Sequence, residues 1–208
     1  MTSIFSRFSY YLAKETFSYT KDPKLNSEIF AYALTVIFLN TTAFGGILLF
    51  SWLLNTLNAT LMVWLAFISL RIFAGSRHQT GPLGCWVLTV TVFTSLGFIV
   101  TYTAPIITRF ALMLEAAGFI FALYSVIAYA PVTIASKKFN QRKISKLKTT
   151  AIVIIIIWVS FVFNPNAIAA ARDPMWSLAI TAGLIAQSLS LLPVSFKSRQ
   201  KSHNNTKL

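Results

Sequence analysis

One cysteine and one histidine lie close together in a short polar segment and could carry out nucleophilic catalysis. Cys85 is the only cysteine of the 208 residues, and His78 is one of two histidines. A thiol attacks a carbonyl group as its thiolate, and histidine is the usual base that removes the proton near neutral pH. The second histidine, His203, lies in the polar tail 197–208. His78 and Cys85 are therefore the candidate base and nucleophile.

The residues around this pair have features that suit a catalytic site. Pro82 fits the first turn of a helix, so we expect Cys85 near a helix N-terminus, where the macrodipole favours an anion. Gly75 allows close approach of the backbone. Arg71 and Arg77 could bind a substrate carboxylate or a developing oxyanion, and membrane-surface anchoring is the alternative for Arg77. A structural role also stays open, because free cysteine often packs as a small apolar side chain.

The composition places these residues in a membrane protein. Residues 29–70 and 79–108 contain no Asp, Glu, Lys or Arg, and a membrane-spanning helix needs about 20 such residues. The formal charge of +13 could otherwise indicate nucleic-acid binding, which the long apolar runs argue against. A single cysteine excludes a disulfide within the chain.

Breaks in the apolar runs predict an all-α polytopic membrane protein with one integral membrane domain, 1–196. Prolines and polar clusters mark the breaks, and Asp173 followed by Pro174 is typical of a helix start. The six predicted spans lie near 29–50, 57–73, 82–102, 106–130, 150–163 and 174–192. Residues 1–20 have apolar side chains at helical spacing and predict an amphipathic helix at the membrane interface.

The charge distribution predicts the orientation in the membrane. Lys and Arg concentrate in cytoplasmic loops, and six spans place both termini on one side. Most cations fall on that side, including those of a predicted basic loop, whereas Arg109 and Arg172 fall on the other. We therefore expect both termini in the cytoplasm. The basic loop comprises Lys137, Lys138, Arg142, Lys143, Lys146 and Lys148.

Two motifs resemble those of the AgrB family of membrane endopeptidases. The first has an Arg, a Gly-rich element with His, and a Cys seven residues after the His. The second is an Ala-Pro element that leads into a Lys/Arg-rich loop. Ser76 and Gln79 differ from the Gly and Ala that the family favours, and the resemblance covers nearly the whole chain. The matching residues are Arg71, Ala74, Gly75, His78, Cys85, Tyr129-Ala130-Pro131 and Lys137-Lys138.

The resemblance implies processing of a short AgrD-like precursor peptide for quorum sensing. Cys85 would form a thioester with the precursor while His78 acts as base and then acid, and a Cys or Ser of the precursor would close a thiolactone or lactone ring. Arg71 and Gly75 would support the site, and Lys137 and Lys138, with Arg77, would bind the precursor. We expect membrane lipids and a homodimer as further partners, with no nucleic acid, cofactor or metal.

Two other functions compete with the peptidase. A non-enzymatic multispan peptide exporter or scaffold would use His78 and Cys85 structurally, and a membrane sensor would use the thiol as a redox switch. Glu115, an acid inside the fourth predicted span, is expected either to pair with Arg109 or Arg172 or to line a release path.

Overall fold

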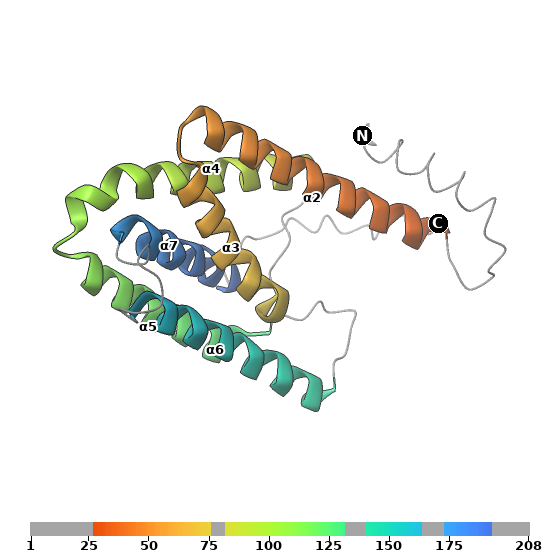
Figure 1. The fold of residues 1–208 in the computed structure, drawn as a ribbon. Helices are drawn as coiled ribbons and strands as arrows, with labels where there is room; N and C mark the ends of the chain where they lie inside the picture. Colours follow the sequence, from red (N-terminus) through yellow and green to blue (C-terminus); the bar gives the residue numbers. More distant parts are fainter. Residues whose placement is uncertain (1–26, 76–81, 132–139, 164–172, 193–208) are drawn as a thin grey trace, which may run out of the picture.

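The computed structural model describes residues 27–75, 82–131, 140–163 and 173–192, and within these ranges the fold is all-α (Figure 1). The predicted interfacial helix 1–20 and the tail 197–208 lie outside the described residues. The helices are α2 (Ser27–Leu53), α3 (Leu57–Ala74), α4 (Pro82–Ile107), α5 (Ala111–Tyr129), α6 (Gln141–Phe163) and α7 (Pro174–Leu191).

Six helices of the described chain are long and apolar enough to cross a membrane. Their backbone N–H and C=O groups pair within each helix, as a hydrocarbon environment requires. The predicted fold class, an all-α multi-pass membrane protein, is confirmed.

Three helix ends differ from the predicted spans. Helix α4 continues beyond 102 through Pro105 to Ile107, because a proline so close to the helix end removes little of the hydrogen bonding. A turn then delays α5 to Ala111 rather than 106, and Phe110 N–H donates to the Ile107 carbonyl at 2.8 Å. Helix α6 begins at Gln141 rather than 150, since Lys and Arg are good helix formers.

The correction to α6 changes the predicted basic loop. Four of its six cations belong to the first turns of a helix, and the remaining two, Lys137 and Lys138, lie outside the described residues. Much of this basic segment is therefore a helical surface with a defined spacing. The helical cations are Arg142, Lys143, Lys146 and Lys148.

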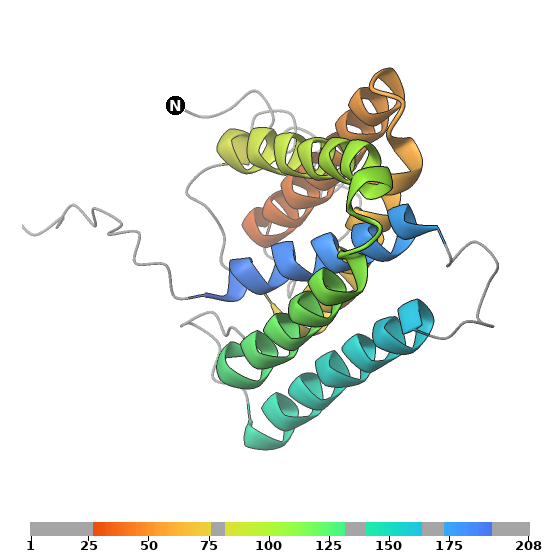
Figure 2. The ribbon, with the colours of Figure 1, turned by 90° about the vertical axis from the view of Figure 1, so that its left-hand side faces the viewer.

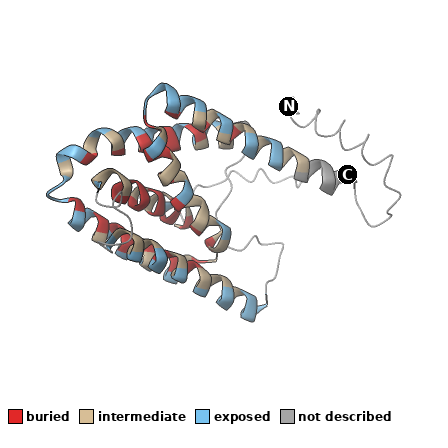
Figure 3. Ribbon diagram, viewed as in Figure 1, coloured by how far each residue is buried: buried red, intermediate tan, exposed pale blue. Residues whose placement is uncertain are grey.

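Helix α7 is the central element of the fold. It lies between the layer that contains α2 and α4 and the layer that contains α5 and α6 (Figure 2), and it packs most extensively on α3 and α5. Buried residues follow it along its length (Figure 3). Asp173 accepts a hydrogen bond from the Met175 N–H at 2.9 Å, and Pro174 follows it, so the predicted helix start is confirmed.

Small residues allow these helices to approach closely. A Cβ atom at Gly183 of α7 would collide with the carbonyl oxygen of Val63 on α3, and one at Gly118 of α5 would collide with Thr181 on α7. Lipid tails are as apolar as the side chains, so close packing and hydrogen bonds drive helix association in membranes. The glycines make α7 the common contact of α3 and α5.

The hydrogen bonds between helices show which ends lie together. Gln187 near the end of α7 bonds to Gly75 at the end of α3, and Lys148 near the start of α6 bonds to Ile127 near the end of α5. Among the described cations, those near these ends are Arg71 and the four of α6, whereas Arg109 lies at the opposite end. The assignment of the basic end to the cytoplasm stays a prediction.

Candidate active site

The end of α3 provides Arg71 and Gly75. Arg71 is half-buried in the last turn, and its guanidinium carbon lies 5.4 Å from the centre of the Phe67 ring, one turn earlier. The Gly75 N–H donates to the Arg71 carbonyl at 2.9 Å. This packing holds the guanidinium against its own helix, with a cation–π contact replacing part of its hydration.

Gly75 has a backbone conformation that only glycine adopts readily. Its φ is 75° and its ψ is −176°, a region closed to residues with a Cβ atom. The residue ends α3 and directs the chain away from the helix axis. A glycine is therefore required here by the backbone, which explains in physical terms why it belongs to the predicted motif.

Cys85 lies in the first turn of α4, which begins at Pro82 as predicted. Its thiol is free and half-buried, and its carbonyl accepts a hydrogen bond from Thr89 Oγ1 at 2.7 Å. The first N–H groups of a helix have no partner within the helix, so the positive end of the dipole acts on this turn.

Arg71 lies in the last turn of α3 and Cys85 in the first turn of α4, and these two helices pack on each other. A guanidinium and a helix N-terminus each stabilise an oxyanion that forms close to them. The structure thereby brings together two of the residues that the sequence singled out. Arg77 and His78, the other two polar members, lie outside the described residues.

Gln187 adds a residue to this end of the molecule that sequence reasoning did not select. Its Nε2 atom donates to the Gly75 carbonyl oxygen at 2.7 Å, and the residue is completely buried. A glutamine within an apolar span is a sequence signal for a buried polar contact. Its partner Gly75 is 112 positions away, so the sequence does not identify it.

Glu115 is buried in α5 and accepts a hydrogen bond from Ser177 Oγ of α7. Within the described residues it forms no ion pair with Arg109, which is exposed, and Arg172 lies outside them. The predicted pairing with Arg109 is therefore wrong, because the adjacent helix supplies a neutral hydroxyl instead.

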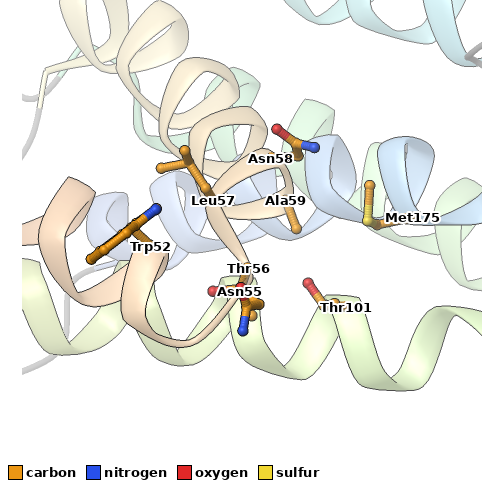
Figure 4. Close-up of a pocket in the computed structure, with 8 residues that line it drawn as sticks. All are labelled: Trp52, Asn55, Thr56, Leu57, Asn58, Ala59, Thr101 and Met175. Atoms are coloured by element: carbon orange, nitrogen blue, oxygen red, sulfur yellow. The ribbon is translucent and has the colours of Figure 1, made fainter.

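A cavity of about 280 Å³ opens at the opposite end of the helices (Figure 4). It lies where the turn between α2 and α3 meets α4 and the start of α7, and its lining includes Trp52, Asn55, Thr101 and Met175. These residues belong to helix ends remote from Gly75 and Cys85. The cavity is thus separate from the candidate active site.

Comparisons with known proteins give two matches. A family model described as accessory gene regulator B matches residues 5–191. A protein from Staphylococcus intermedius, named accessory gene regulator protein B, is 26% identical over 142 residues, which cover 68% of this chain and 69% of that protein. No solved structure gives a significant match.

Proposed function

The chain belongs to the accessory gene regulator B family, and from this membership we propose that it is a membrane cysteine endopeptidase. Its substrate is a short precursor peptide, and its product is a cyclic quorum-sensing signal. The location of Cys85 in the first turn of α4, a helix that packs on the one ending with Arg71 and Gly75, carries the proposal.

The first half of the reaction cleaves the precursor. His78 takes the proton of the Cys85 thiol, and the sulfur attacks a peptide carbonyl carbon of the precursor. The C–N bond then breaks, and His78 returns the proton to the leaving amine. The C-terminal part of the precursor leaves, and the N-terminal part stays bound to Cys85 as a thioester.

The second half closes the ring. A Cys or Ser side chain within the bound peptide attacks the thioester carbonyl, its proton passes to His78 and then to the departing Cys85 sulfur, and a thiolactone or lactone is released. With a Cys in the precursor, one thioester replaces another, so little free energy is needed. An ordinary protease would instead lose this intermediate to water.

Arg71 fits the role of stabilising negative charge that develops on the attacked carbonyl. Its guanidinium is held over Phe67 by the last turn of α3, so it needs little reorganisation during the reaction. Gly75 supports the same turn through its N–H bond to the Arg71 carbonyl.

The basic end of the molecule suits capture of the precursor. Lys137 and Lys138 precede α6, and the first turns of α6 add four cations with exposed or half-buried side chains. We infer that this end faces the cytoplasm, where a newly made peptide with an acidic segment would meet it. Arg77, next to the proposed base, would contact the peptide near the bond that is cleaved.

The test is co-expression with an AgrD-like precursor peptide, followed by mass spectrometry of peptide and protein. Wild-type chain should release a cyclic peptide and carry a peptide adduct on Cys85, whereas Cys85→Ala and His78→Ala should release none. His203→Ala removes the other histidine and is the matched control. Cleavage by a folded Cys85→Ala variant would exclude the thioester mechanism, whereas peptide export that persists in this variant would favour the exporter or scaffold.

A further inference from the structure

The cavity at the end of the helices remote from Cys85 is large enough for a small ligand. Its volume of about 280 Å³ is close to the lower limit of small-molecule pockets, about 300–1,000 Å³. Its walls come from the ends of α2 and α3 together with α4 and α7 (Figure 4). A cavity between the helices of a bundle is a common place for a ligand site.

The lining of this cavity is uncharged. It contains no Asp, Glu, Lys, Arg or His. A charged ligand would lose its hydration on entering, and no opposite charge would replace that hydration. The lining therefore favours a neutral ligand, in contrast to the basic end of the molecule, where Arg142 and Lys146 are exposed.

Two carboxamides in the lining are free to bind a ligand. Asn55 and Asn58 are exposed, and within the described part of the chain neither side chain forms a hydrogen bond. Asn55 has φ at 54°, a left-handed conformation that asparagine tolerates, so the turn accounts for this residue. Asn58 lies in the first turn of α3 and is not its N-cap, which is Thr56. Neither backbone conformation nor capping accounts for an asparagine at 58.

The rest of the lining adds hydrogen-bond acceptors and apolar surface. Thr101 Oγ1 donates to the Gly97 carbonyl at 2.8 Å, so its proton is already used and its oxygen can only accept. Trp52 contributes an exposed indole ring and Met175 a half-buried thioether. The cavity thus combines neutral donors and acceptors with aromatic and apolar surface.

A peptide has the chemistry that this combination fits. A carboxamide presents an N–H donor and a C=O acceptor, as a peptide group does, so the two groups can exchange two hydrogen bonds. The indole and the thioether offer contacts to an apolar or aromatic side chain of the ligand. A hydrocarbon chain would instead remove the carboxamides from water without replacing their hydrogen bonds.

We propose that this cavity binds a short uncharged peptide segment with an apolar side chain, supplied by the ring of the cyclic product. The identity of the peptide rests on the function proposed above. In a thiolactone or lactone the C-terminal carboxyl carbon of the ring is bonded to a sulfur or oxygen of the peptide itself. The ring therefore has no C-terminal carboxylate and meets the requirement for a neutral ligand.

The test measures binding of a synthetic cyclic peptide lactam to the full chain in lipid bicelles by ¹⁹F NMR. The peptide contains fluorophenylalanine and methionine and no charged group, and the lactam replaces the thioester so that Cys85 cannot react with it. Protein-free bicelles give the fraction of peptide that partitions into lipid. The variants are Asn58→Ala and Asn55→Gly, and glycine keeps the left-handed conformation at 55.

Asn40→Ala is the matched control. Asn40 is also an exposed asparagine of α2 or α3, but it lies outside the cavity and its Nδ2 donates to the Val36 carbonyl of its own helix at 2.8 Å. We expect Asn58→Ala and Asn55→Gly each to raise Kd about two- to tenfold, the effect of one lost neutral hydrogen bond. Asn40→Ala should leave Kd unchanged. Asn55→Gly decides the result where Asn58→Ala does not accumulate in the membrane.

The proposal is wrong if the Kd values of the Asn55, Asn58 and Asn40 variants are equal. It is also wrong if Arg71→Gln weakens binding while Asn58→Ala does not, because the peptide then binds at the candidate active site. Binding of maltose instead of the lactam would assign the cavity to a sugar.

The binding measurement needs no precursor and no cleavage, so it is independent of the peptidase. A chain that binds the lactam through Asn58 but never cleaves precursor contradicts the peptidase and supports the peptide site. Normal cleavage without binding that depends on Asn58 contradicts the peptide site alone.

Discussion

Gln187 Nε2 lies 2.7 Å from the carbonyl oxygen of Gly75, and the two residues are 112 positions apart in the chain. The last helix is therefore attached to the residue at which α3 ends, a few residues before the proposed base. Helix α7 also packs on α5, so the candidate site is anchored to the centre of the bundle. This arrangement makes the geometry of the site depend on the packing of α7.

Replacement of Gly75 by alanine should impair processing more than folding. A Cβ atom at φ 75° costs of order 1–3 kcal/mol, which the chain relieves by changing its direction where α3 ends. We expect cleavage of precursor to fall at least about tenfold, in line with a misplacement of catalytic groups. The measurement is the cleavage rate in bicelles. Gly45→Ala is the control, because a Cβ atom there meets nothing within 4 Å.

The Gly45→Ala and Gly75→Ala variants could cleave the precursor at the same rate. In that case the backbone conformation of Gly75 does not contribute to the reaction. A lower yield of both variants in the membrane would indicate instead a general effect on insertion. The ratio of cleavage rate to protein amount separates these cases.

Arg71 should affect the chemical step more than precursor binding. Removal of one donor to an oxyanion typically lowers kcat by about 10²–10³-fold, and we expect Arg71→Gln to approach the lower figure. Arg71→Lys keeps the charge but loses the planar donor group, so it should recover only part of the rate. Steady-state kinetics with a synthetic precursor give kcat and KM separately. A change confined to KM would place Arg71 in substrate binding rather than in catalysis.

Replacement of Gly183 by leucine should destabilise the bundle. The first atom of the new side chain would collide with the Val63 carbonyl, a backbone group that cannot move aside as a flexible side chain does. Forced overpacking of this kind costs about 1–3 kcal/mol or more. Thermal unfolding in detergent should show a lower midpoint, with Gly45→Leu as the exposed control. An unchanged midpoint would show that α3 and α7 are less closely packed than described.

Much of the fold could be predicted because its signals are local. The long runs without charge determine how many helices can span the membrane, and Asp173 and Pro174 mark the start of α7 through a single capping bond. The ends of α4 and α6 were less predictable. Pro105 is tolerated within the last turn of α4, and the cations before residue 150 continue a helix instead of forming a loop.

The candidate site was predictable only in part. Cys85 and Arg71 stand out by residue type and lie on two helices, α4 and α3, that pack on each other. The bond from Gln187 to Gly75 could not be predicted, because it depends on a contact between the ends of α3 and α7. The partner of Glu115 was missed for the same reason, since charge suggested an arginine and the packing of α5 on α7 supplied Ser177.

The cations at the start of α6 provide a final prediction about how the precursor is captured. Electrostatic attraction between exposed charges weakens as salt shortens the Debye length from about 10 Å at 0.1 M to about 3 Å at 1 M. If the basic end binds an acidic segment, KM for the precursor should rise steeply over that range while kcat changes little. Replacing Arg142 and Lys146 by glutamine should raise KM at low salt and flatten its salt dependence. Arg109→Gln, at the opposite end of the helices, is the matched control. If it raises KM as much as the substitutions in α6 do, the cations of α6 contribute to membrane topology alone.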